Sequence, residues 1–180
     1  MNTLNTKIVK IKKMSKVLNA FLKIGAIVLI MVIILQIVLI AISSSLDLSS
    51  NAIIDVFGIN IPLNGNINNF RAIMLFTMSS AAVMAAVLFV ASFIFKNISR
   101  DGLPFTKRNS NKIKIISLLL IAHEVLLPPL RLLILMVLIP EAEAAVSMNL
   151  GIIVAAAVFF CIALIFEYGA ELQQQSDETL

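Results

Sequence analysis

The sequence predicts an all-α integral membrane protein: a four-helix bundle with a small extracellular loop, in a single transmembrane domain over residues 1–180. Hydrophobic residues make up 60% of the chain and charged residues 13%, against about 45–50% and about 25% in soluble domains. The apolar residues are concentrated in four runs, and about 20 such residues suffice to cross a bilayer. Lysine and arginine flank these runs, so the net charge of +4 indicates orientation in a membrane rather than direct binding of nucleic acid.

The first span is expected at 24–42, after a flank of residues 1–23 that contains six lysines. Its apolar run exceeds the 7–15 residues of a signal peptide, so we expect an uncleaved helix. Two interpretations of the flank are open: a short amphipathic helix on the membrane surface, or a plain basic segment that sets orientation.

A loop at 43–71 separates the first span from the second, which is expected at 72–95. The loop is rich in glycine, proline and asparagine, which are turn formers. Its segments AIIDVF and INIPL have the composition of strands and predict a short hairpin.

The third and fourth spans are expected at 113–139 and 146–166. Asp101-Gly102 and Pro104 predict a turn in the basic loop at 96–112. Thr106 is placed to cap the helix that follows, because a threonine hydroxyl accepts a hydrogen bond from an early helical amide. A short acidic connection joins the last two spans, and an acidic tail at 167–180 ends the chain.

Basic residues set the expected orientation. The flank before the first span holds six and residues 96–114 hold six, whereas the other two connections hold only Arg71. Because lysine and arginine stay in the cytoplasm, both termini and the basic loop are expected there.

The third span carries His123, Glu124 and Arg131 at a depth where charge costs several kcal/mol unless it is partnered. Glu124 and Arg131 share a helix face, while His123 is expected to point about 100° away, toward another neighbour. Pro128 and Pro129 predict a kink, because each removes a helical amide. At similar depth, other spans supply polar groups, which gives a candidate intramembrane cluster: Gln36, Ser79, Ser80, His123, Glu124 and Arg131.

Three interpretations of this cluster are open. It is an ion pair that fixes helix packing, an outward-facing site for a small ligand, peptide or proton, or the centre of a proton-coupled transporter. The sequence contains no nucleophile–base arrangement, phosphate loop or metal-ligand spacing, so we expect a protein that is not an enzyme and uses no cofactor or metal.

Residues 95–117, FKNISRDGLPFTKRNSNKIKIIS, and the C-terminal IFEYGAELQQQSDETL resemble the YoaS-like proteins, a bacterial four-helix membrane family of unknown function (domain of unknown function 2975). The resemblance covers nearly the whole chain. It implies a multi-pass protein of the bacterial cytoplasmic (inner) membrane, often encoded beside a small helix-turn-helix regulator, and hence a role in signalling or gene control. The family pattern does not clearly include His123, Glu124 and Arg131.

The basic loop and the acidic tail can dock on each other or present a composite surface to a soluble partner. The candidate partner surface consists of Arg100, Asp101, Gly102, Pro104, Phe105, Thr106, Lys107, Arg108, Asn109, Glu167, Gly169, Glu171, Leu172, Gln173, Asp177 and Glu178. We therefore expect a sensory or regulatory component with a cytoplasmic partner, which could be a DNA-binding regulator, or a homo-oligomer. The alternatives are a small transporter or ligand-binding protein that uses the Glu124/Arg131 pocket, and an immunity-type membrane protein.

Overall fold

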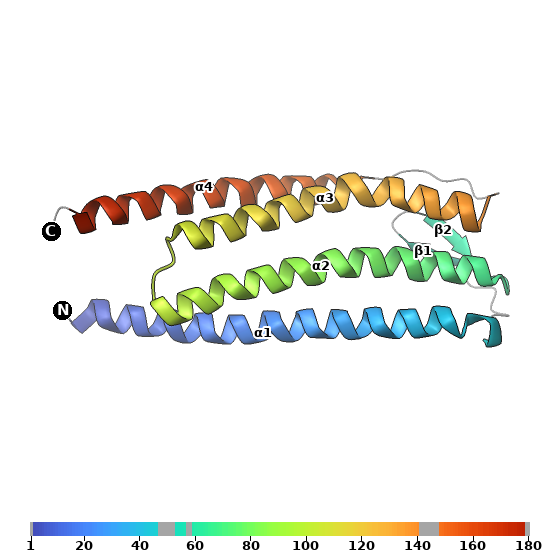
Figure 1. Ribbon diagram of the computed structural model, residues 1–180, viewed down its shortest axis with the longest axis horizontal. Coiled ribbons are helices and arrows are strands. Elements are labelled where there is room, and N and C mark those ends of the chain that lie inside the picture. Colours follow the sequence, from blue (N-terminus) through green and yellow to red (C-terminus); the bar gives the residue numbers. More distant parts are fainter. Residues whose placement is uncertain (1, 47–52, 57–58, 141–147, 179–180) are drawn as a thin grey trace.

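The computed structural model of the protein describes residues 2–46, 53–56, 59–140 and 148–178. Four long helices dominate it: α1 (Asn2–Ala41), α2 (Ile67–Asp101), α3 (Lys107–Leu138) and α4 (Leu150–Glu178) (Figure 1). All four are long and apolar enough to cross a membrane. The prediction of an all-α four-helix membrane architecture is confirmed.

Helix α1 includes the basic flank as well as the first span. At 1.5 Å per residue its 40 residues extend about 60 Å, about twice the thickness of the hydrocarbon core. The flank therefore continues along the axis of the span instead of turning to lie on the membrane surface.

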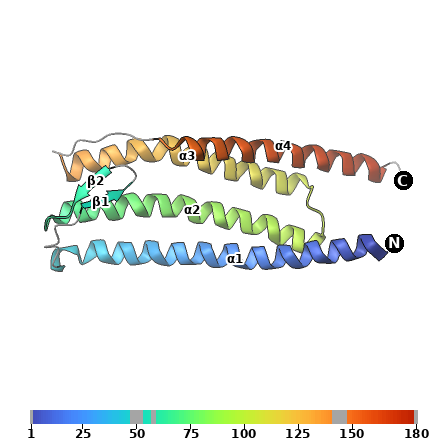
Figure 2. The same ribbon diagram turned by 180° about the vertical axis from the view of Figure 1, so that it is seen from behind.

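The loop after α1 contains a 3₁₀ turn (Ser43–Ser45) and the predicted hairpin, formed by β1 (Ile53–Val56) and β2 (Ile59–Pro62). The strands are antiparallel, with Ile54 opposite Ile61. Val56 and Ile61 are buried against Phe76 of α2 and Leu135 of α3. Seen from behind, the hairpin lies at the ends of these two helices (Figure 2). We call this end of the bundle the hairpin end.

Helices α2 and α3 are joined by a tight turn, as the sequence predicts. Gly102 ends α2 in the left-handed conformation, with φ +77°, and its amide donates to the carbonyl of Ile98 at 2.8 Å. The hydroxyl of Thr106 caps α3 by accepting from the amide of Asn109 at 3.2 Å. Helix α3 continues through Pro128 and Pro129, and its ribbon is arched in Figure 1.

Helix α4 begins at Leu150, later than the predicted start of the fourth span at residue 146, which lies outside the described residues together with the rest of 141–147. Residues 148 and 149 are described and are not helical. The physical reason is a local cap: the side-chain oxygen of Asn149 accepts from the amide of Gly151 at 2.9 Å.

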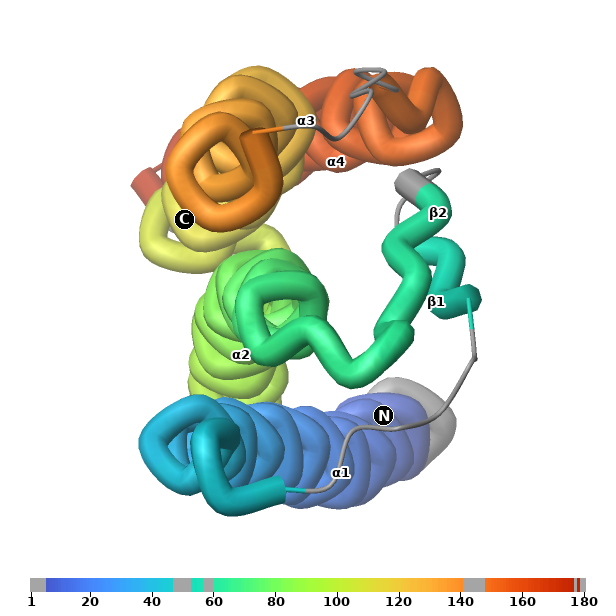
Figure 3. Tube along the Cα trace, turned by 90° about the vertical axis from the view of Figure 1, so that its right-hand side faces the viewer, coloured from blue at the N-terminus to red at the C-terminus, as the bar shows by residue number. Residues whose placement is uncertain are grey.

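Each helix packs against its neighbours in the sequence, and Figure 3 shows α1 and α4 at opposite edges of the bundle. Both termini lie at one end, which we call the terminal end (Figure 1). There α2, α3 and α4 share an apolar core built on Ile94, Ile98, Ile113, Ile116 and Ala163. Helix α4 runs from the terminal end only to the middle of α3 (Figure 1). The hairpin-end half of α3 therefore does not pack against α4.

Candidate functional site

A pocket of about 520 Å³ lies where α4 begins, beside the middle of α3. Its ionisable side chains, His123, Glu124 and Arg131, all come from α3 and are all buried. Its remaining wall is the start of α4, formed by Met148, Asn149, Leu150, Gly151 and Ile152. The structure thus brings together the three ionisable residues that the sequence singled out.

Glu124 is the best-bonded group of this pocket. One carboxylate oxygen, Oε2, accepts from the backbone amide of Asn149 at 2.8 Å, and the other, Oε1, lies 2.8 Å from Nδ1 of His123. A carboxylate at a helix N-terminus is favoured by the helix dipole. The side chain of Glu124 therefore ties the middle of α3 to the first turn of α4.

The expectation that His123 points toward a different neighbour is wrong. Adjacent helical residues normally diverge, but a buried carboxylate costs free energy until its oxygens are hydrogen-bonded. The Glu124 side chain satisfies this requirement by lying between His123 and Asn149. In the tautomer that carries its proton on Nδ1, His123 donates to Glu124.

In the ion-pair interpretation of the cluster, Arg131 is the partner of Glu124, but the hydrogen bond described for Arg131 goes to α2. Its Nη2 donates to Ser80 Oγ of α2 at 3.0 Å. Among the described residues, ion pairs within 4.0 Å join Arg100 to Asp101 and Lys114 to Glu167, and the contact of His123 with Glu124 is a hydrogen bond when the imidazole is neutral. Arg131 lies seven residues, or two helical turns, beyond Glu124 along α3, which is a rise of about 10 Å.

Three members of the predicted cluster do not line the pocket: Gln36, Ser79, and Ser80, which binds Arg131. Gln36 donates from Nε2 to Thr77 Oγ1 at 2.8 Å and so joins α1 to α2. Ser79 donates to the carbonyl of Phe76 in its own helix, as serine often does inside an apolar helix. Similar depth along the spans therefore did not place the side chains of Gln36 and Ser79 beside Glu124.

Asn149 is the pocket residue that sequence reasoning missed. A helix-capping signal was present, because an asparagine directly before an apolar run is a preferred N-cap. The hydrophobic run begins several residues earlier, and this placed the predicted start of the span too early.

Two buried serines hold α4 against α3 between the pocket and the terminal end. Ser117 donates to the carbonyl of Ala156 at 2.8 Å, and Ser110 donates to the carbonyl of Ala163 at 2.9 Å. Both bonds have the same antiparallel register as the Glu124–Asn149 bond. Three contacts along the interface thus fix the position of α4 relative to α3.

At the terminal end, the predicted docking of the loop on the tail is present. The rings of Phe105 and Phe166 lie 5.0 Å apart. Gly169 packs so closely on Phe105 that a Cβ there would lie 2.9 Å from the ring. Lys114 and Glu167 form an ion pair of 2.7 Å.

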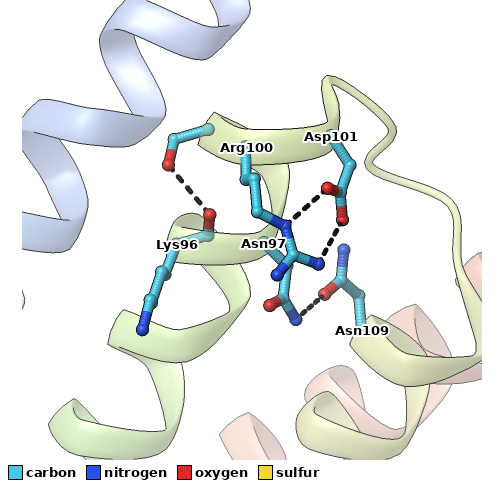
Figure 4. Close-up of polar contacts among 6 residues, drawn as sticks. Lys96, Asn97, Arg100, Asp101 and Asn109 are labelled. Atoms are coloured by element: carbon cyan, nitrogen blue, oxygen red, sulfur yellow. Dashed lines mark hydrogen bonds and ion pairs between the residues drawn. The ribbon is translucent and has the colours of Figure 1, made fainter.

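A buried amide pair holds the loop itself. Asn97 donates to the side-chain oxygen of Asn109 at 3.0 Å, and Asn109 donates to the carbonyl of Pro104 at 3.0 Å. Beside them, Arg100 binds both carboxylate oxygens of Asp101, at 2.7 and 3.1 Å (Figure 4). These contacts join the end of α2 to the loop and to the start of α3, and we call this bonded loop the platform.

The candidate partner surface divides by burial. Gly102 and Asn109 are buried, and Pro104, Thr106, Glu167, Gly169 and Gln173 are half-buried, so these residues mainly support the platform. The side chain of Asp177 lies outside the part of the chain that the structure describes. The exposed members remain available to a partner. They are Arg100, Asp101, Phe105, Lys107, Arg108, Glu171, Leu172 and Glu178.

The described residues contain no group of three or more His, Cys, Asp or Glu side chains that could hold a metal ion. The fold and the pocket define the class of the protein: a helical, multi-pass membrane protein with ionisable groups buried between α3 and α4. Comparison of the chain with family models, with curated proteins and with solved structures found no match.

Proposed function

We propose that this protein is a non-enzymatic signalling component of the bacterial inner membrane that relays the state of its pocket to a soluble cytoplasmic partner. The observation that supports this proposal is the course of α4. The helix begins on the carboxylate of Glu124, and its other end carries Gly169, which packs on Phe105 of the loop. One continuous helix thus connects the pocket to the candidate partner surface.

The charge of Glu124 provides a way to move this helix. An ionised carboxylate binds the amide of Asn149 more strongly than a neutral acid does, because the bond is charge-assisted and the helix dipole adds to it. A proton, or a ligand that displaces the carboxylate, weakens this bond. The free energy that holds α4 in register then falls, and the contact between Gly169 and Phe105 changes at the far end.

The proposed orientation places the terminal end in the cytoplasm, following the excess of basic residues there. The resemblance of residues 95–117 and of the tail to the YoaS-like proteins makes a small helix-turn-helix regulator the proposed partner. The loop is basic and the tail is acidic, so such a partner meets charges of both signs, which favours specificity.

Distance measurement between spin labels tests the relay. Cys161, the single cysteine, is replaced by serine. Labels are then attached to cysteines introduced by Leu103→Cys in the loop and Leu172→Cys in the tail, both at exposed positions. We expect Glu124→Gln to change the distance distribution in reconstituted vesicles. The matched control is Ser79→Ala, which removes a bond within α2 outside the pocket. Identical distributions for the wild type and Glu124→Gln contradict the relay.

Affinity capture tests the partner. Full-length protein is expected to retain a cytoplasmic protein that a variant lacking residues 168–180 loses. Glu178→Gln, which changes one exposed charge and leaves the helix in place, controls for nonspecific electrostatic capture. Unchanged capture by the truncated variant rejects the tail as part of the partner surface.

A second candidate function is transport of a proton or small ligand through the pocket. It is favoured by the pocket volume of about 520 Å³, which lies in the range of small-molecule sites, and by the burial of three ionisable side chains. Glu124→Gln discriminates between the two functions. A transporter loses proton-coupled flux in vesicles, whereas a signalling protein has no such flux to lose.

A further inference from the structure

At the terminal end, three cationic side chains from three helices lie close enough to one carboxylate for their charges to act on it. They are Lys12 of α1, Arg100 of α2 and Arg108 of α3, and the carboxylate is that of Asp101. We call these four residues the basic corner. They carry a net charge of +2 at neutral pH, and Arg100, Asp101 and Arg108 are exposed.

Gly102 allows α1 to contribute Lys12 to this corner. A Cβ at position 102 would lie 2.7 Å from Cε of Lys12 and 3.2 Å from Cγ2 of Ile8. The absence of a side chain lets α1 pass directly over the end of α2. Lys12 therefore lies directly beside the residue that follows Asp101, with its Nζ 3.5 Å from the same Cβ position.

The electrostatics of the basic corner favour an anion. Arg108 and Lys107 lie in the first turn of α3, which contains no acidic residue, although the helix dipole disfavours cations there. Arg100 lowers the pKa of Asp101 by its hydrogen bonds, and the charges of Arg108 and Lys12 act in the same direction. Asp101 neutralises only one of the cations, so a positive potential remains.

Depth indicates which anion fits. Lys96 is the first charged residue after the apolar run of α2, and Asp101 lies about 7–8 Å beyond it along the helix. The headgroup layer on each side of a bilayer is about 5–8 Å thick. The cations of the corner thus lie at the depth of lipid headgroups.

We propose that the basic corner is a binding site for the phosphate of an anionic phospholipid. Lys12, Arg100 and Arg108 supply the charge-assisted donors, and the phosphate completes the neutralisation that Asp101 begins. This site is separate from the pocket and does not depend on the proposed signalling function. A bound lipid would hold α1, α2 and α3 together at the terminal end.

Native mass spectrometry of the full-length protein in mild detergent tests the site, with phosphatidylglycerol and phosphatidylcholine as probes. We expect phosphatidylglycerol to bind at least about tenfold more tightly than phosphatidylcholine, given several basic contacts near the membrane surface. The triple variant Lys12→Gln, Arg100→Gln and Arg108→Gln should remove this preference. The matched control, Lys7→Gln, Lys10→Gln and Lys13→Gln, removes three exposed cations from α1 and should retain it.

Three results would overturn the proposal: equal binding of both lipids, equal loss of preference in the control, or displacement of phosphatidylglycerol by inorganic phosphate or an acidic peptide at matching concentration. Arg108→Gln alone guards against a folding defect, because Arg108 is exposed. With its helical content checked by circular dichroism, it should weaken phosphatidylglycerol binding about fivefold. No change in that variant also contradicts the site.

Discussion

The carboxylate of Glu124, halfway along α3, accepts a hydrogen bond of 2.8 Å from the backbone amide of Asn149, the residue that caps α4. The two residues are 25 positions apart, and each is needed for the geometry of the other. The amide gives a buried carboxylate a partner, and the carboxylate satisfies an amide at a helix start that an apolar environment would leave unpaired.

We expect Glu124→Ala to lower the free energy of unfolding by about 3 kcal/mol, because it leaves buried polar groups without partners. Glu124→Gln should cost less, about 1–2 kcal/mol, since an amide oxygen can still accept from Asn149 but carries no charge. Unfolding in mixed micelles measures both values. Double-mutant cycles should give Glu124 a larger coupling to His123 than to Arg131. A larger coupling to Arg131 would contradict the contacts described above.

Gly169→Ala should destabilise the protein by about 1–2 kcal/mol, because the added methyl group meets the ring of Phe105. Phe105→Ala removes the two ring atoms at 2.9 and 3.0 Å and leaves only the Cβ of residue 105, at 3.3 Å. In that background Gly169→Ala should be neutral or stabilising, since alanine is the better helix former. The measurement is again unfolding in mixed micelles. An equal penalty in both backgrounds would show that Gly169 is needed for another reason.

Thr106→Ala should cost about 1 kcal/mol, the usual value for loss of an N-cap side chain. Thr106→Ser keeps the hydroxyl that accepts from the amide of Asn109 and should retain most of the stability. Thermal unfolding followed by circular dichroism compares the two variants. If both variants lose equal stability, the methyl group of Thr106 matters more than its hydroxyl.

We expect the ionisation of Asp101 to make the stability of the protein depend on pH under acidic conditions. Its pKa is lowered from the ordinary value of 3.8, first by the hydrogen bond from Arg100. A carboxyl group with a lowered folded-state pKa stabilises the protein above its unfolded-state pKa. That contribution is lost as the pH falls through the folded-state pKa. Asp101→Asn should therefore reduce the fall in melting temperature between about pH 5 and pH 3, as measured by thermal scans. An unchanged slope assigns the acid sensitivity to other groups.

Local signals in the sequence were sufficient for much of the fold. The apolar runs predicted four helices, Thr106 predicted the start of α3, and two segments of strand-like composition among turn formers predicted the hairpin. Each signal depends on residues within a few positions of one another, so one chain segment carries the full information. The flank before the first span was harder to interpret, because basic residues are compatible with both a surface helix and a continuing one.

The site was predicted only in part, for a different reason. His123, Glu124 and Arg131 are conspicuous in an apolar run, and burial of such groups implies partners. Which partners they find depends on the register between helices. Gln36 and Ser79 have the same depth as the pocket but face other neighbours, and depth alone carries no information about rotation around the helix axis.

The sequence by itself determined that the chain forms four membrane-length helices, with ionisable groups in the third and basic segments at one end, because hydropathy and capping are properties of adjacent residues. Only the packing of the helices determines that α4 begins at mid-depth on Glu124, that Arg131 donates to Ser80 and that Lys12 lies beside Gly102. These contacts join residues far apart in the chain, and they follow from the positions at which whole helices pack, which many weak interactions set together.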